Sequence, residues 1–318
     1  MLSIYKSDGK ALNSLTLESV DKGSWFNLVK PTGDELKSVA EATNVPADFL
    51  KAALDREELS RIEIESDYIL LITNIPIMDE TNNNFDTLPL GIIITNEYFI
   101  TVCVKENNVL TYFNSENAMT FCTFKKTQFL LQILYRSAKI YLKYLRYINH
   151  QTDNLERDLR RSIKNNALFQ LLDWQKSLVY FTTSLKDNDV VLKKLLRIIS
   201  TNNHQLVLKK YEDDEELLED VLIENRQAIE TVEIHSNILT SMMDAFASII
   251  SNNLNIVMKY LTSVTILVAV PTMIASFFGM NVHVPLNQSP WGFIAVVFIS
   301  FCSMSLTAFV LWKKDMFS

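Results

Sequence analysis

The sequence predicts an α/β domain followed by a long-helix stalk and two transmembrane α-helices. Three observations carry this prediction. Residues 260–312 contain no Asp, Glu, Lys or Arg, so all 67 such residues of the chain lie outside this block. Residues 92–270 contain neither Gly nor Pro, as expected for long helices. Runs rich in Ile, Val, Tyr, Phe and Thr, typical of strands, are concentrated in the first third of the chain.

The N-terminal part of the chain alternates strand-like and helix-like segments. The strand-like runs are residues 25–29, 68–77, 90–95 and 98–104. Helical patterns cover residues 34–42 and 46–55, and Asp8-Gly9 is typical of a hairpin turn. We therefore predict an α/β domain over residues 1–125, facing the cytoplasm.

Long helices are predicted to follow. Residues 127–200 have a helical pattern with a break near Asn165-Asn166, which predicts an antiparallel helix pair, and Asn202-Asn203 marks another turn. A heptad spacing then begins at Leu218 and continues for about 40 residues, which indicates a long helix that packs against other helices. Its positions are Leu218, Leu222, Asn225, Ile229, Val232, Ser236, Leu239, Met243, Phe246, Ile250, Asn253 and Val257. We predict a helical domain with a stalk helix over residues 126–258.

The charge-free block predicts a transmembrane domain over residues 259–318. Its apolar spans, residues 261–278 and 291–312, would reach roughly 27 and 33 Å as helices, close to the hydrocarbon thickness of a bilayer. The predicted helices are thus about 259–278 and 291–312, joined by an outer loop, 279–290. Lys259, Lys313 and Lys314 flank the spans, so both termini of this multi-pass protein should be cytoplasmic.

A small and polar stripe runs along the predicted stalk helix into the first span. In the same 4,3 spacing its members are Asp244, Ser248, Ser251, Asn255, Met258, Thr262, Thr265, Ala269, Thr272, Ser276 and Gly279. Around a shared axis such a stripe would line a narrow aqueous path. Small residues also permit close helix packing, so the stripe alone leaves both interpretations open. Two spans per chain cannot enclose a pore, which therefore requires an oligomer.

Composition argues against several other classes. The net charge of −7 argues against a nucleic-acid partner. The four histidines lack ligand-like spacing and the sequence has no Gly-rich phosphate loop, so an enzyme is not indicated. The three cysteines show no paired spacing, which excludes a disulfide scaffold.

Gly279-Met280-Asn281 lies between the two spans, after an upstream Asn255-x-x-Met258-Lys259-x-Leu261-Thr262 and a Pro271-Thr272 pair. In these motifs the chain resembles the CorA magnesium transporter family. The resemblance implies a funnel-shaped cyclic homopentamer in the cell (inner) membrane, with hydrated Mg²⁺ as the transported ion and no resident cofactor. It implies a selectivity filter at Gly279, Met280 and Asn281. The pore-lining residues that it implies are Asp244, Asn255, Met258, Leu261, Thr265, Ala269, Thr272 and Ser276.

The resemblance also implies regulation by cytoplasmic Mg²⁺. Seven carboxylates lie in residues 212–220, and massed carboxylates favour a hard divalent cation. Asp220, Glu216 and, at the end of a strand, Asp79 are the candidate regulatory ligands. The alternative is an ordinary solvated helix face.

Two departures from the family pattern leave other interpretations open. Phe278 stands where the family usually has Tyr, and the outer loop contains no acidic residue, so cations should be concentrated less at its mouth. The alternatives are a Zn²⁺, Co²⁺ or Ni²⁺ transporter of the same family, or a non-conducting membrane-anchored scaffold or sensor.

Overall fold

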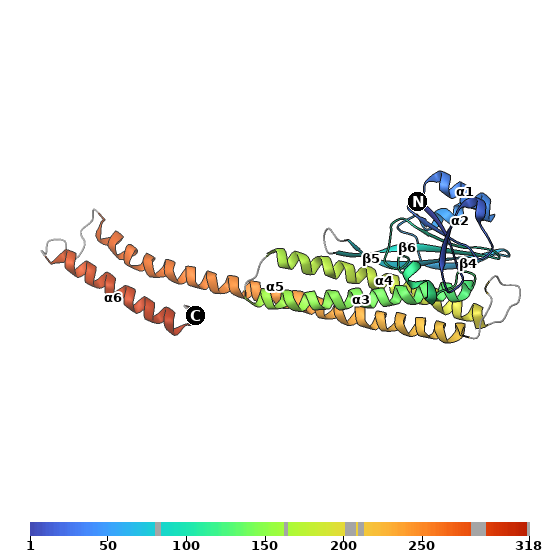
Figure 1. Ribbon diagram of the computed structural model, residues 1–318. Coiled ribbons are helices and arrows are strands. Elements are labelled where there is room, and N and C mark those ends of the chain that lie inside the picture. The colour runs from blue at the N-terminus through green and yellow to red at the C-terminus, as the bar shows by residue number, and fades with distance from the viewer. Residues whose placement is uncertain (80–83, 162–164, 201–207, 209–212, 281–290, 317–318) are drawn as a thin grey trace. The chain divides into compact units, whose positions relative to one another are not determined.

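The computed structural model describes residues 1–79, 84–161, 165–200, 208, 213–280 and 291–316 (Figure 1). The chain forms two compact units, Met1–Ser241 and Met242–Ser318, called unit 1 and unit 2 below. Helix α5 (Asp214–Phe278) contributes residues to both.

Unit 1 contains a seven-stranded mixed sheet with the order β2-β1-β3-β7-β6-β5-β4. The strands are β1 (Leu2–Ser7), β2 (Leu12–Leu15), β3 (Trp25–Val29), β4 (Arg61–Ile64), β5 (Tyr68–Asp79), β6 (Asn84–Thr95) and β7 (Phe99–Cys103). The four predicted strands are present as β3, β5, β6 and β7, and the Asp8-Gly9 turn joins β1 to β2. The sequence patterns missed β1, β2 and β4. Among these, β2 and β4 form the sheet edges, where a strand needs less of the apolar run that marks a buried one.

One face of the sheet packs against two short helices, α1 (Gly33–Thr43) and α2 (Ala47–Ala52) (Figure 1). Their apolar side chains join those of the strands in one core, made of Ile4, Phe26, Leu28, Leu36, Val39, Val45, Leu50, Ala53, Leu70, Ile72, Ile93, Ile100 and Val102. A capping box begins α1, because Thr32 accepts from the Glu35 backbone N–H and Glu35 accepts from that of Thr32. Helix α1 therefore starts where the chain leaves β3.

The other face packs against α3 (Lys126–Arg161) and α4 (Asn165–Ser200). Buried Asn188 of α4 fastens this layer to β5: its Oδ1 accepts from the Thr73 hydroxyl and the Asn74 N–H, each at 2.9 Å, and its Nδ2 donates to the Asn74 carbonyl at 2.8 Å. Tyr141 of α3 donates to the same carbonyl at 2.9 Å. The last strand ends at Cys103 and α3 begins at Lys126, and sheet and helices share one compact unit.

The first part of α5 packs against α3 and α4, and the heptad pattern explains which face it buries. Leu218, Asn225, Val232 and Leu239 are all buried. Asn225 donates to the Leu185 carbonyl, and the Lys139 amino group lies 2.5 Å from the Glu224 carboxylate, which raises the pKa of Lys139. The predicted helix pair and the long third helix are confirmed. Residues 162–164 and the predicted turn at Asn202-Asn203 lie outside the described residues.

Unit 2 consists of the remainder of α5 and of α6 (Gly292–Lys313). Both helices contain an 18-residue window that is long and apolar enough to cross a membrane, and only 6% of each window is buried. Helix α5 continues without interruption through Pro271 to Phe278. The two helices thus end and begin where the predicted spans do, and the intervening loop from residue 281 lies outside the described residues.

Candidate functional site

The predicted pore-lining residues lie on one side of α5 in unit 2. All eight are exposed in the single chain: Asp244, Asn255, Met258, Leu261, Thr265, Ala269, Thr272 and Ser276. Exposure alone distinguishes nothing here, because most of this helix is exposed. What distinguishes the stripe is its position relative to the other helix of the unit.

A second stripe on α5 is covered. Its half-buried or buried members recur every three or four residues and are Ser263, Leu267, Val270, Ile274 and Phe278. At 100° per residue this face lies about 180° from the predicted pore-lining residues. On α6 the half-buried residues also recur at helical spacing and are mostly small: Gly292, Ala295, Val296, Ser300, Ser303, Thr307 and Ala308. Helix α6 therefore packs through small residues on the face of α5 opposite the polar stripe.

The threonines of the polar stripe present oxygen acceptors. The Thr265 hydroxyl donates to the Leu261 carbonyl at 2.8 Å, and the Thr272 hydroxyl donates to the Val268 carbonyl at 2.7 Å. Each hydroxyl proton is thus used within the helix, and the oxygen lone pairs remain available on the exposed side. Such a surface can accept hydrogen bonds from the water shell of a cation without supplying a formal charge.

The first two residues of the predicted filter follow directly after α5. The Gly279 N–H donates to the Ala275 carbonyl at 3.0 Å, and the Met280 N–H to the Phe277 carbonyl at 3.4 Å. Gly279 does not have the positive φ that favours glycine, and a Cβ placed there would have its nearest contact at 3.4 Å, on the Ala275 carbonyl. Nothing within one described chain therefore requires glycine at this position. Asn281, the third predicted filter residue, lies outside the described residues.

The sequence patterns missed a contact that joins the chain end to α5. Helix α6 ends in a Schellman motif: the Met316 N–H bonds the Leu311 carbonyl, the Asp315 N–H bonds the Trp312 carbonyl, and Asp315 has a φ of 53°. This turn brings the Met316 carbonyl to 3.1 Å from the buried hydroxyl of Ser263. The available signal was that Ser263 is a hydroxyl residue on the otherwise apolar face of α5.

The predicted regulatory carboxylates do not meet within one chain. Glu216 and Asp220 are exposed one turn apart near the start of α5. Asp79 ends β5 and lines a cavity together with Lys105. Near this end of β5 the Phe85 N–H donates to Ser177 of α4, whereas the early part of α5 contacts α4 further along, where Asn225 donates to the Leu185 carbonyl. Among the described residues, no group of three or more His, Cys, Asp or Glu side chains could hold a metal ion.

The acidic run has a simple local role in the structure. Its described part occupies the first turns of α5, where Asp214 is buried and its neighbours are exposed. Carboxylates there interact favourably with the unpaired N–H groups of the helix start. Regulation at Asp79, Glu216 and Asp220 therefore stays a prediction, and it would need ligands from more than one chain.

The chain combines an α/β unit with two helices of membrane length, of which α5 begins in that unit. This combination is typical of a membrane-anchored protein. A model of the family described as CorA-like Mg²⁺ transporter protein matches residues 21–314, and the chain belongs to this family. The chain is 29% identical over 281 residues to the cobalt/magnesium transport protein CorA of Methanocaldococcus jannaschii, covering 86% of this chain and 84% of that protein. It is 22% identical over 300 residues to the magnesium transport protein CorA of Helicobacter pylori, covering 91% and 89%.

A solved structure agrees with this assignment. The complete structure of the CorA magnesium transporter from Methanocaldococcus jannaschii matches with a TM-score of 0.81 at 25% identity, over 98% of this chain and 96% of that one. The predicted fold class and the resemblance stated above are thereby confirmed.

Proposed function

We propose that copies of this chain assemble as a cyclic homopentamer in the cell membrane and conduct hydrated Mg²⁺ along the polar stripe of α5. The observation that carries the proposal is the position of that stripe. Helix α6 covers the opposite face of α5, so the stripe is left open along the whole apolar span of a chain from a Mg²⁺ transporter family. Lipid would satisfy the apolar residues of α5, but the oxygen acceptors of Thr265 and Thr272 are better satisfied by water.

The chemistry of the stripe suits an ion that keeps its water. Mg²⁺ dehydrates reluctantly, so a pore that binds its hydration shell needs acceptors rather than direct ligands. Thr265 and Thr272 provide such acceptors, and Asn255 adds amide oxygens near the predicted cytoplasmic end of the span. Met258 and Leu261, more than half exposed in one chain, would form an apolar constriction where five copies meet.

The filter assignment draws support from Gly279. Since the described residues give no steric reason for glycine there, the requirement would come from neighbouring copies or from the passing ion. In the assembly, Gly279 and Met280 would supply backbone carbonyls and Asn281 would supply amides to the outer water shell of Mg²⁺. The flanking cations Lys259, Lys313 and Lys314 support a cytoplasmic position for both termini.

The test is Mg²⁺ uptake in a strain that lacks its own magnesium transporters. Asn255→Leu should lower uptake about tenfold, because it replaces a ring of polar groups by an apolar barrier. The matched control is Asn253→Leu: Asn253 is also exposed on α5 but lies about 160° around the helix from Asn255. Equal loss in both variants, or no uptake by the intact protein, would refute the pore assignment.

Ion identity needs separate measurements with Mg²⁺, Co²⁺ and Zn²⁺. The archaeal relative is named for both cobalt and magnesium transport. We expect uptake of Mg²⁺ and of Co²⁺ but not of Zn²⁺, since the stripe contains no Cys or His for a softer metal. Zinc uptake exceeding magnesium uptake would assign the chain to the other branch of the family.

A further inference from the structure

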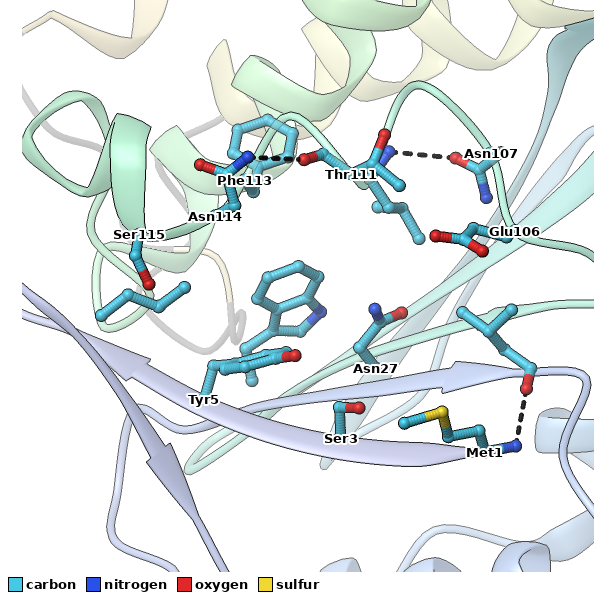
Figure 2. A pocket seen from close by; sticks show the side chains of 14 residues that line it. Met1, Ser3, Tyr5, Asn27, Glu106, Asn107, Thr111, Phe113, Asn114 and Ser115 are labelled. Atoms are coloured by element: carbon cyan, nitrogen blue, oxygen red, sulfur yellow. Dashed lines mark hydrogen bonds between the residues drawn. The ribbon is translucent and has the colours of Figure 1, made fainter.

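Unit 1 contains a cavity of about 390 Å³ on the face of the sheet opposite α1 and α2 (Figure 2). Its floor is formed by side chains that alternate with the core residues of β1 and β3. The cross-strand pairs Ser3–Asn27 and Tyr5–Trp25 point toward the cavity, while Ile4, Phe26 and Leu28 belong to the core. The volume lies in the range of small-ligand pockets.

The cavity forms because the segments that pack on this face of the sheet change at β3. Over β3 and β7, Phe129 of α3 packs on Trp25 and Phe99, with ring centroids 5.2 and 4.7 Å apart. Over β1 and β2 the residues that follow β7 form the roof instead, including Leu110 and Phe113, both nearly fully buried. One end of the cavity is therefore aromatic, and the other is lined by hydroxyl, amide and carboxylate groups.

Asn27 is fixed in one orientation and presents hydrogen-bond donors to the cavity. The buried Trp25 indole N–H donates to the Thr101 hydroxyl at 2.8 Å, and this hydroxyl donates onward to Asn27 Oδ1 at 3.0 Å. The oxygen of the Asn27 amide is thereby identified, and its Nδ2 group faces the cavity, where no described residue accepts from it. A ligand atom beside Asn27 must be an acceptor.

The charge of the lining selects against anions. Glu106 directs its carboxylate toward the cavity in Figure 2, and no Lys or Arg lines it. The N-terminal amino group of Met1, the nearest cation of the lining residues, is engaged by the Val29 carbonyl at 2.7 Å and by the Glu35 carboxylate at 3.1 Å. A ligand must therefore offer a donor or a positive group to Glu106, and a phosphate would be repelled.

We propose that this cavity binds a flat nitrogen heterocycle with an exocyclic amine and no phosphate. The ring lies against Tyr5 at the aromatic end of the cavity, a ring nitrogen accepts from Asn27 Nδ2, and the amine donates to Glu106. Adenine is the simplest probe of this class. The site lies wholly in unit 1, so its occupancy can be measured separately from the proposed ion transport.

The test is calorimetric titration of the detergent-solubilised full chain with adenine, purine and adenosine 5′-monophosphate. Adenine should bind, and purine, which lacks the amine, should bind about tenfold more weakly because it loses the hydrogen bond to a charged group. The monophosphate should also bind at least tenfold more weakly than adenine, because it brings a negatively charged group to a cavity whose lining contains a carboxylate and neither Lys nor Arg. Absence of adenine binding at millimolar concentration, or equal binding of the monophosphate, would overturn the proposal.

Two variants assign the binding to these residues. Asn27→Asp keeps the acceptor for Thr101 but removes the Nδ2 donor, and it should weaken adenine binding about tenfold. Its control, Asn13→Asp, adds the same charge on exposed β2 outside the cavity and should leave binding unchanged. Glu106→Gln, at an exposed site, should narrow the gap between adenine and the monophosphate. A wild-type affinity of Asn27→Asp for adenine would overturn the proposal. If that variant proves unstable, an unchanged gap between adenine and the monophosphate in Glu106→Gln would overturn it.

Discussion

Unit 1 and the membrane-length helices of unit 2 satisfy their polar groups in opposite ways. In unit 1 the buried side chain of Asn188 makes four hydrogen bonds to residues outside its own helix, all within 2.9 Å. On α5 in unit 2, the hydroxyls of Thr265 and Thr272 bond only the preceding turn of their own helix. The hydrogen-bond network around Asn188 is therefore complete in one chain, whereas the stripe of unit 2 still has free acceptor capacity.

The apolar residues show the same contrast. The cores of unit 1 bury large side chains completely, among them Trp25, Phe129 and Tyr141. In unit 2 Leu311 is the most buried large side chain of α6 among the described residues, at 8% exposure. A bilayer accounts for exposed Leu, Ile and Phe, but it does not account for polar side chains that recur along one side of α5. In the proposed function, lipid and further copies of the chain would cover the surfaces of unit 2 that one chain leaves exposed.

The largest expected effect comes from replacing Asn188, which tests whether unit 1 depends on its buried hydrogen bonds. Asn188→Leu keeps the branching of the side chain but is larger, and it leaves the Thr73 hydroxyl, the Asn74 N–H and the Asn74 carbonyl with fewer partners in a buried place. We expect a loss of about 3 kcal/mol in the free energy of unfolding, measured by urea denaturation of the solubilised protein. Asn237→Leu, at an exposed position of α5, is the control and should change stability by less than about 0.5 kcal/mol. Equal stability of both variants would show that unit 1 does not depend on this network.

Replacing Gly91 tests how closely the side chains of unit 1 are packed. A Cβ at Gly91 of β6 would lie 2.6 Å from the Ala53 Cβ, whereas one at Gly33 would meet nothing within 4 Å. Gly91→Ala should therefore destabilise unit 1 by about 2 kcal/mol, and Gly33→Ala should not. Adding Ala53→Gly to Gly91→Ala removes the clashing methyl group and should restore part of the loss in the same denaturation assay. A neutral Gly91→Ala variant would mean that the sheet and the segment after α2 can move apart freely.

The sequence predicted the elements that have a strong internal pattern. The buried strands β3, β5 and β7 contain apolar runs, so the sequence predicts them. The heptad spacing of α5 indicates which of its residues are buried, so the sequence predicts this helix too. The edge strand β4 was missed because Arg61 and Glu63 interrupt its apolar residues. Its position is fixed by pairing with β5, which a local pattern does not contain.

The part of the candidate site that lies on one helix was predictable from the sequence, and the parts that depend on tertiary contacts were not. The polar stripe follows a single helix, so its spacing places Asn255, Thr265 and Thr272 on one side without tertiary information. That α6 lies on the opposite side could not be read from either helix alone. The Asn27 cavity was missed because Ser3, Asn27 and Glu106 come together only through strand register and the segment after β7.

The smallest expected effect concerns Ser263, whose hydroxyl contacts a residue outside its own helix in unit 2. The Ser263 hydroxyl lies 2.8 Å from the Lys259 carbonyl and 3.1 Å from the Met316 carbonyl, so it can return to its own helix when the tail leaves. This alternative limits the net strength of the contact to about 0.6 kcal/mol, the average for such bonds between membrane helices. Ser263→Ala should therefore raise hydrogen exchange at the Asp315 and Met316 amides about threefold. Ser305→Ala, an exposed hydroxyl on α6, should leave that exchange unchanged. If Ser263→Ala has no effect, the tail is held by its Schellman motif alone, and the polar contacts of unit 2 within one chain are reduced to those inside each helix.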